Sequence, residues 1–330
     1  MKNRNYILIS ILAILLILLF ISDLLFGSVS VKFSDFFKTI VGMQENQIIN
    51  EIIVNYRLPK ALTAVLAGAA LSVSGLLLQT LFRNPLADPY ILGVSSGASL
   101  GVAIVVLTSS LLPAMLVQSG WTLIVAAIIG ASLVLALVVT FSFKVRDVVS
   151  LLIIGIMFGT IASAIVTVLQ NASNPDFLKI FITWTFGSLS SVTWSYMLVL
   201  LPVMTIGILF AFLLQKSLDG LLLGEKYAAS LGISVRKMRL FIVLITGILS
   251  GGITAFTGPI AFVGVAVPHL ARGLFRTSAH HILLTGSILC GAILLLICDI
   301  ITQIPANTLP VNTVSALLGA PVIIYILLKK

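Results

Sequence analysis

Side chains that could carry out bond chemistry are few in this sequence and scattered. The three histidines, His269, His280 and His281, have no carboxylate three or four residues away that could orient an imidazole for acid–base catalysis. Phosphate-binding GxxxxGK[ST], zinc-binding HExxH and nucleophile-bearing GxSxG motifs are all absent. Cys290 and Cys298 fall in one apolar segment and are expected to be inert, buried thiols. The sequence therefore predicts no catalytic residue and no metal site.

One enzymatic alternative is an intramembrane enzyme that acts on a lipid or isoprenoid, with His280 and His281 as acid or base. Such an enzyme would need an acidic, metal-binding cluster at one membrane face. Asp147, Asp219 and Glu225 are too scattered along the chain to supply that cluster. We therefore expect that the chain is not an enzyme.

Acidic residues within the apolar segments, typical of ion-driven transporters, are nearly absent. Asp23 and Asp299 lie close to the ends of their segments, where we expect water at the membrane interface to solvate them. A secondary transporter driven by protons or sodium therefore lacks its coupling residue and stays a remote alternative. If the protein moves a solute uphill, the energy is expected to come from another subunit.

The composition is that of a membrane protein. Of 330 residues, 59% are hydrophobic and only 9% are charged, whereas a soluble domain has roughly 25% charged residues. Apolar segments of about 20 residues cross a hydrocarbon core of about 30 Å as helices. We predict an all-α, polytopic integral membrane protein with about ten transmembrane helices, some short or broken. The predicted spans are 6–26, 59–82, 90–111, 121–143, 149–170, 193–214, 238–256, 259–277, 282–301 and 308–328.

The distribution of basic residues predicts the orientation, because cytoplasmic loops carry an excess of Lys and Arg. Most of the 19 Lys and Arg fall in loops that share one side if the N-terminus is cytoplasmic. Both termini are then cytoplasmic, and the first span, 6–26, is too long for a signal-peptide core and is expected to stay uncleaved. The longest loop on the cytoplasmic side covers about 216–237, and 27–58 forms the first outer loop. This bias explains most of the net charge of +9, so no nucleic-acid partner is expected.

Small residues recur at helical spacing along the second span. Ala64, Gly68, Ser72 and Gly75 form a stripe that would let transmembrane backbones approach closely, and we interpret it as ordinary helix packing. Gln79 continues the stripe. Because an unpaired amide is costly in lipid, Gln79 must either find a partner or line a wet path.

Two stretches interrupt the helical pattern. "RNPLADPYILGVSSGASLG" (83–101) holds two prolines four residues apart, which cannot sit in one continuous helix. "FTGPIAFVGVAVPHLARG" (256–273) is interrupted in the same way at Pro259 and Pro268. Irregular backbone inside a membrane is tolerated only where protein covers it or where it lines a cavity. Both stretches are expected to lie in such places.

These two stretches and "LLGAPVIIYILLKK" (317–330) strongly resemble the FecCD-type permease subunits of binding-protein-dependent ABC importers for iron–siderophores, haem and vitamin B12. The resemblance runs from about Arg57 to the C-terminus, in the family's order and spacing. It implies one transmembrane permease domain, 1–330, that pairs with a second permease as a homo- or heterodimer in the lipid bilayer. It also implies two cytoplasmic ATPase subunits, which bind ATP and Mg, and an outer substrate-binding protein or lipoprotein. No cofactor is expected on this chain.

The resemblance assigns the cytoplasmic loop to ATPase coupling, because 221–234 matches the family's pair of short coupling helices. Gly224 and Gly232 would supply turns, apolar side chains would be buried in the ATPase, and charged side chains would form a rim. An amphipathic helix on the lipid surface is the weaker alternative, because the stretch lacks Trp and Phe. The predicted coupling residues are Leu221, Leu222, Gly224, Glu225, Ala228, Ala229, Leu231 and Gly232.

On the outer side, the resemblance assigns Arg57 and Lys60 to docking of the binding protein. In the family, basic residues at this motif meet acidic residues on that protein, which speeds encounter and fixes register. Interfacial anchoring by snorkelling side chains is the alternative. Gln303 and Thr308 stand where the family has further charged residues, which would fit a heterodimer whose other permease supplies that contact.

For the inner gate, the resemblance points to the turn with Asn84 and Leu86 and to Val148 and Val149 between the fourth and fifth spans, with Gln79 on the path. A rim of apolar side chains can close a wide path by dewetting. A path without strong ligands suits a bulky chelate, because tight binding midway would trap it.

The predicted function is therefore the permease subunit of an ABC importer in the bacterial cytoplasmic membrane. It is expected to translocate an iron(III)–siderophore complex by ATP-driven alternating access. Haem and vitamin B12 importers of the same family are the alternatives, because the binding protein selects the ligand.

Overall fold

The computed structural model describes residues 2–27, 29, 31–42, 46–109, 119–145, 148–303 and 309–328. Every regular element in these residues is helical, which confirms the predicted all-α class. Seven helices are long and apolar enough to cross a membrane, and shorter apolar helices accompany them. The long helices are α1 (Lys2–Leu25), α4 (Leu58–Leu81), α7 (Gly120–Ser142), α8 (Val148–Ala172), α10 (Trp194–Leu213), α13 (Val235–Thr257) and α15 (His280–Gln303). The shorter ones are α5 (Val94–Leu107), α14 (Val263–Phe275) and α16 (Val311–Leu328).

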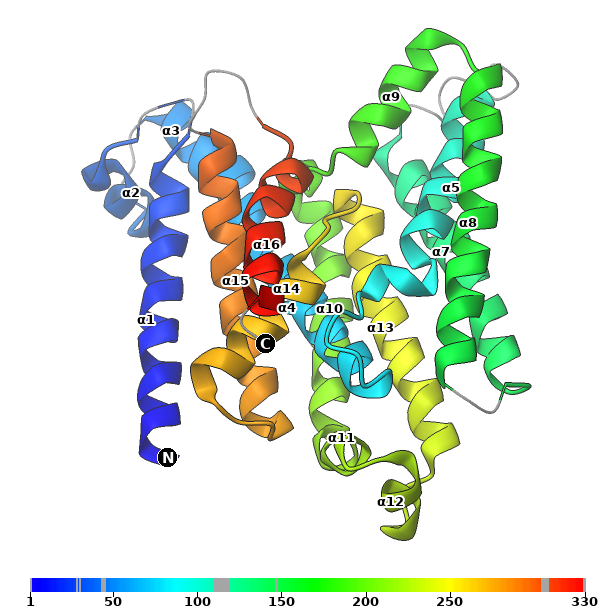
Figure 1. Ribbon diagram of the computed structural model, residues 1–330. Helices are drawn as coiled ribbons and strands as arrows, with labels where there is room; N and C mark the ends of the chain where they lie inside the picture. Colours follow the sequence, from blue (N-terminus) through cyan, green and yellow to red (C-terminus); the bar gives the residue numbers. More distant parts are fainter. Residues whose placement is uncertain are drawn as a thin grey trace.

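Short elements cap the two ends of this bundle (Figure 1). One end carries α2 (Phe33–Ile40), α3 (Gln47–Glu51) and α9 (Pro175–Thr185), and we call it the α9 end. The other carries α11 (Gln215–Leu222) and α12 (Glu225–Ser230), and we call it the α12 end. The remaining elements are the π-helical η1 (Ile52–Arg57), which continues into α4, and the 3-10 turns η2 (Pro89–Leu92) and η4 (Leu189–Ser191).

The small-residue stripe lets α4 occupy the centre of the bundle, where α10, α13, α14 and α15 all pack against it. A Cβ atom at Gly68 would collide with the backbone of Gly291 on α15, and one at Gly75 would collide with the backbone of Gly264 on α14. Backbones approach this closely only where neither partner carries a side chain. The stripe is therefore helix packing, as predicted.

A Gly75→Val substitution is expected to destabilise the bundle by about 3 kcal/mol, because α4 and α14 must separate to make room. The measurement is the thermal midpoint of the detergent-solubilised protein, followed by size-exclusion chromatography. Gly273→Val is the control, since a Cβ atom at Gly273 on α14 would meet nothing within 4 Å. Equal midpoints for the two variants would contradict the packing account.

The two interrupted stretches pack against each other, far apart though they are in the sequence. Gly93 ends η2 with a φ of +75°, and Gly258 ends α13 with a φ of +74°, a region that favours glycine. The hydroxyl of Tyr90 accepts hydrogen bonds from the backbone N–H of Ile260 (3.1 Å) and from Oγ1 of Thr254 (3.2 Å). Protein thus covers the irregular backbone, which is one of the two situations that the sequence predicts.

Candidate functional site

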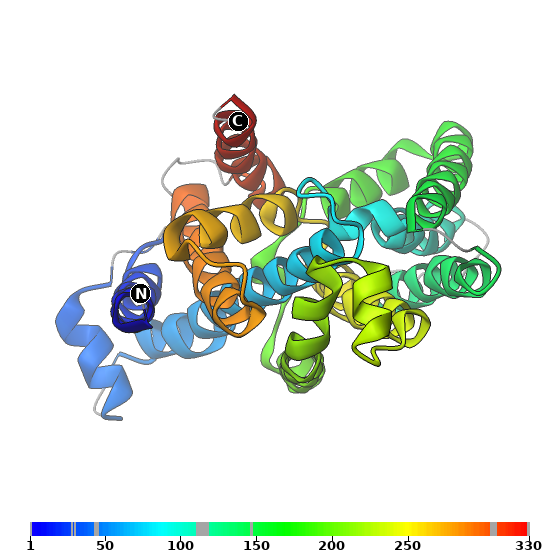
Figure 2. The ribbon, with the colours of Figure 1, turned by 60° about the horizontal axis from the view of Figure 1, so that its bottom comes forward.

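The loop predicted to be cytoplasmic, 216–237, contains two short helices, as the family resemblance implies. Gly224 separates α11 from α12 with a φ of +117°, and Gly232 follows α12 with a φ of +80°. Both values lie in the left-handed half of backbone space, where a residue with a side chain is strained. Figure 2, in which this end comes forward, shows the pair beside the ends of α10 and α13. The two glycines therefore supply the turns assigned to them.

The predicted coupling residues divide into an exposed and a buried set. Leu221 and Ala228 face the permease, and Ala228 has no exposed surface. Leu223 is 63% exposed. We define the coupling tip as the exposed apolar residues of this pair, which are Leu222, Leu223, Tyr227, Ala229 and Leu231. Leu223 and Tyr227 are absent from the sequence-based set, because helical spacing alone does not show which side the transmembrane body covers.

A chain of polar contacts fixes α11 to the transmembrane body. Oδ1 of Asp219 accepts from the backbone N–H (2.9 Å) and from Nδ1 (2.7 Å) of His280, so it caps the first turn of α15. Nε2 of His280 lies 2.8 Å from Oγ1 of Thr80 at the end of α4. Arg83 donates to the carbonyl of Leu222 (3.2 Å). Sequence spacing could not reveal the Asp219–His280 pair, because 61 residues separate its members.

A second set of contacts holds α12. Glu225 forms an ion pair with Arg239 on α13, with 3.3 Å between Oε1 and Nη2. The same guanidinium donates to the carbonyl of Val145, just after α7 (3.2 Å). The side chain of Glu225 is 40% exposed and has this partner inside the permease, and its contact with the ATPase stays a prediction.

At the α9 end, Arg57 is buried and both terminal nitrogens of its guanidinium donate hydrogen bonds within the chain. It donates to the carbonyls of Leu24 and Leu25 (2.8 Å each) and of Val29. These carbonyls lie at and beyond the end of α1, where helical carbonyls lack partners. Arg57 therefore ties the end of α1 to the start of α4.

Lys60, one turn further along, belongs to a buried polar cluster with two acidic residues. Its Nζ atom lies 3.0 Å from Oδ2 of Asp299. Gln303 donates to Oδ1 of Asp23 (3.1 Å) and to Oδ2 of Asp299 (3.3 Å). Asp23 and Asp299 are each only 2% exposed, so the expectation that water solvates them is wrong. The reason is that α1 packs against α15 and covers both carboxylates.

These internal partners bear on the docking assignment. Arg57 and Lys60 lie together at the end predicted to face outward, and each already has acceptors within the chain. An acidic residue of a binding protein would have to compete with those acceptors. Docking through this pair stays a prediction, and the structure gives both residues a role in joining α1, α4 and α15.

The predicted gate residues Asn84 and Leu86 lie in a tight turn held from two sides. Oδ1 of Asn84 accepts from the backbone N–H of Leu86 (2.9 Å), and Nε2 of His269 on α14 bonds the carbonyl of Pro85 (2.8 Å). The side chain of Leu86 is exposed and lines a cavity with Phe262 and other residues of the second interrupted stretch. The turn therefore presents an apolar side chain from a fixed backbone.

Val148 and Val149 begin α8, where Val149 is exposed and Val148 packs against the core. The turn with Leu86 and helix α8 both adjoin η2, since Gly155 of α8 packs on the backbone of Ile91. The two halves of the predicted gate are therefore connected through η2.

Gln79 finds protein partners. Its amide nitrogen donates to the carbonyls of Gly264 (3.3 Å) and Val265 (3.2 Å), and its oxygen accepts from Arg272. The amide is buried between α4 and α14. This is the first of the two outcomes expected for it, and its place on the path stays a prediction.

The family model described as the FecCD transport family matches residues 14–329. The chain belongs to the FecCD transport family. The FecCD chain is 36% identical to the hemin transport system permease protein HmuU of Yersinia pestis over 332 residues, covering 98% of this chain and 96% of that protein. It is 37% identical to the vitamin B12 import system permease protein BtuC of Salmonella typhi over 280 residues, covering 83% and 82%.

Solved structures agree with this placement of the FecCD chain. A metal-chelate type ABC transporter in an inward-facing conformation superposes with a TM-score of 0.87 at 30% identity, covering 98% of this chain and 99% of that one. PsaBC from Streptococcus pneumoniae in complex with Fab shares the fold, with a TM-score of 0.56 at 17% identity. The FecCD chain is thus a multi-pass permease of the ABC importer class.

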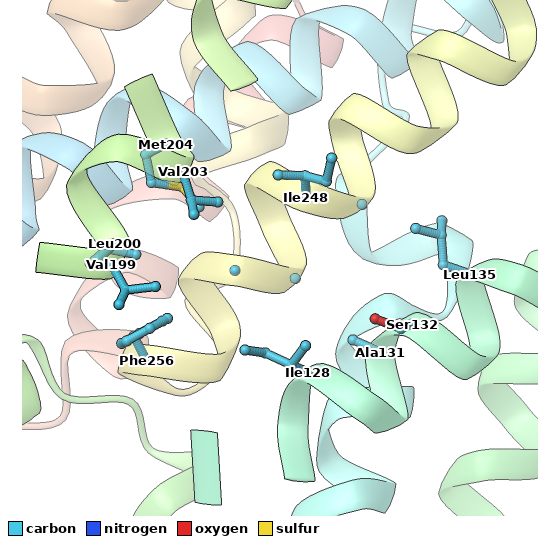
Figure 3. Close-up of a pocket in the computed structure, with 13 residues that line it drawn as sticks. Ile128, Ala131, Ser132, Leu135, Val199, Leu200, Val203, Met204, Ile248 and Phe256 are labelled. Carbon is cyan, nitrogen blue, oxygen red and sulfur yellow. The ribbon is translucent and has the colours of Figure 1, made fainter. Parts of the chain in front are cut away.

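One cavity of this FecCD permease, of about 290 Å³, lies between α7, α10 and α13. Figure 3 shows Val199 and Val203 of α10 on one side and Ile128 and Leu135 of α7 on the other, with α13 between them. Apart from Ser132, every residue that lines it is apolar or glycine. Such a lining offers a polar chelate few hydrogen-bonding groups beyond the hydroxyl of Ser132.

A second cavity, of about 280 Å³, has a different character and lies between α5, α8 and α9. Most of its lining residues carry an uncharged hydroxyl or amide group, whereas the surrounding spans are apolar. They are Ser95, Ser96, Ser99, Ser163, Thr167, Gln170 and Thr185, with Val166 and Phe181 completing the wall. In the described residues, no group of three His, Cys, Asp or Glu is placed to hold a metal ion.

Proposed function

We propose that this chain is the membrane-spanning subunit of an importer that partner ATPase subunits drive through alternating access. Membership of the FecCD family supports an importer permease. The coupling tip is the single observation that supports an ATP-driven mechanism. It exposes apolar side chains on a helix pair that projects from the transmembrane body, and the core of a protein interface has this composition.

The α12 end is proposed to be cytoplasmic, as the excess of basic residues in its loops predicts. ATP and Mg would bind the partner ATPase, and this chain, as one permease domain, would pair with a second permease in the bacterial cytoplasmic membrane. A binding protein would dock at the α9 end, near Arg57 and Lys60. Asn84, Leu86, Val148 and Val149 would close the path at its inner side.

Within this class, we propose an iron(III)–siderophore complex as the substrate. The cavity between α5, α8 and α9 supports this choice, because its hydroxyl and amide groups match a chelate with an oxygen-rich periphery. Haem is the second candidate, since HmuU, a hemin permease by name, aligns along nearly the whole chain. Vitamin B12 follows, on the similarity to BtuC.

Uptake assays are expected to identify the substrate. A strain lacking only this subunit, complemented or not with the gene, would be given radiolabelled hydroxamate and catecholate iron chelates, haem and cobalamin. Complementation is expected to restore ATP-dependent uptake of one iron chelate and of neither haem nor cobalamin. Restoration of haem or cobalamin uptake alone would contradict the siderophore assignment. If complementation restored uptake of none of these compounds, the result would contradict the proposal that the chain is an importer subunit.

A further inference from the structure

The two coupling helices are attached to different parts of the transmembrane body. Helix α11 contacts α4 and α15, and Asp219, His280 and Thr80 join these three helices. Helix α12 contacts α13, and Arg239 there connects it with the chain between α7 and α8. A displacement of α11 and α12 can therefore move two separate regions of the transmembrane body.

The first attachment leads into a rigid unit. Helices α4 and α15 meet at Gly68 and Gly291, where the backbones touch without intervening side chains. Because a close-packed protein interior is hardly compressible, a force applied to one of these helices moves both of them together. Asp219 and His280 therefore serve to fix α11 on this unit.

The second attachment leads to the predicted gate. The guanidinium of Arg239 is almost wholly buried and bridges Glu225 of α12 to the carbonyl of Val145. Val145 lies three positions before Val148, the first residue of α8. One turn earlier on α13, Arg236 donates to the carbonyl of Phe143 (3.4 Å) and lies 5.1 Å from its ring. Two arginines of α13 thus donate hydrogen bonds to carbonyls at the end of α7. Of these two, Arg239 is the one that also forms an ion pair with α12.

We propose that Arg239 is a positioning residue that links movement of α12 to the inner end of α8, where Val148 and Val149 lie. The inference rests on the proposed function. A guanidinium suits this bridging role, because it is planar, carries a positive charge and donates hydrogen bonds in two directions at once. One member of the ion pair is buried, so parting the charges would leave the guanidinium of Arg239 buried without its carboxylate partner. Movement of Glu225 would therefore pull on the α7–α8 junction through one side chain.

The experiment compares Arg239→Met with Lys144→Met in the complete complex with ATPase and binding protein. Lys144 is an exposed cation at the same end whose amino group lies over the ring of Phe141, so this control removes one positive charge without touching the link. Uptake per ATP hydrolysed is expected to fall by about tenfold in Arg239→Met, with ATPase association retained, and to stay unchanged in Lys144→Met. Equal coupling ratios in the two variants would overturn the inference.

A second readout follows the end of α8 directly. Val149→Cys, in a chain with Cys290 and Cys298 replaced by Ala, would react with a membrane-impermeant thiol reagent applied from the inner side. Adding ATP is expected to change the labelling rate in the Arg239 protein and to leave it constant in Arg239→Met. An ATP response that persists in Arg239→Met would overturn the link.

If Arg239→Met does not assemble, Glu225→Gln tests the same contact. Glu225 is the more exposed partner, and in this variant Arg239 still donates to the carbonyl of Val145. Glu225→Gln alone is expected to lower the coupling ratio, and the double variant is expected to be no worse than Arg239→Met. If the losses in coupling ratio of the two single variants added up in the double variant, Glu225 and Arg239 would not act through a shared contact, and the inference would be overturned. If the unaltered complex moved no chelate at all, the proposed function would fail instead, which separates the two outcomes.

Discussion

A Leu223→Asp variant is expected to lose its association with the ATPase subunits, and with it nearly all uptake, while folding normally. Leu223 is the most exposed leucine of the coupling tip, so a carboxylate there is solvated in the free permease. In the complex, the same carboxylate would be buried without a partner. That costs about 3 kcal/mol, on the order of a 100-fold loss in affinity.

The measurement is co-purification of the ATPase with the permease, together with uptake in cells. Ser278→Asp is the control, because it adds the same charge at an exposed position of the loop before α15. Ala228→Asp provides a contrast. Ala228 is completely buried, so its variant is expected to lose folded protein before any question of binding arises. Normal ATPase association in Leu223→Asp would show that the ATPase binds elsewhere.

A Lys60→Glu variant is expected to unfold at a markedly lower temperature, in the absence of any binding protein. The substitution removes the cation that pairs with Asp299 and places a third carboxylate beside Asp299 and Asp23. Breaking a buried ion pair costs about 3–5 kcal/mol. At about 2 °C per kcal/mol for a large domain, the thermal midpoint should fall by roughly 5 °C or more.

The midpoint would be measured on the purified permease in detergent. Lys179→Glu, an exposed reversal on α9, controls for the change in net charge and should leave the midpoint in place. The result also separates two roles of Lys60. A contact used only for docking would weaken the binding protein's salt-sensitive association at unchanged stability. An unaltered thermal midpoint would therefore contradict a stabilising role of Lys60 in the polar cluster and would favour a role in docking alone.

Local features were predicted well because their causes are local. Hydropathy placed the long helices within a few residues, and Pro89 and Pro259 marked the two interrupted stretches. Gly224 and Gly232 gave the turns of the coupling pair. Each of these depends on a residue's own backbone or on a segment's own length and polarity.

Predictions that depended on neighbours distant in the sequence did less well. Asp23 and Asp299 were predicted to be solvated because both lie near the ends of apolar runs. They are 276 positions apart in the sequence, and in the structure Gln303 donates to both carboxylates where α1 packs against α15. His280 showed no carboxylate nearby in the sequence and has Asp219 in the structure. The ion pair between Glu225 and Arg239, 14 positions apart in the sequence, was not predicted either.

The sequence by itself determined the membrane class, the approximate span pattern, the breaks and the family, because transfer of apolar segments into lipid and the restraints of proline and glycine act within short stretches of chain. Only the tertiary structure decided which polar groups are paired and which side of α12 is exposed. In a chain with so few charges, a pairing depends on which helices pack together, and that choice follows from the shapes of whole helix faces, down to the glycines at which α4 meets α14 and α15.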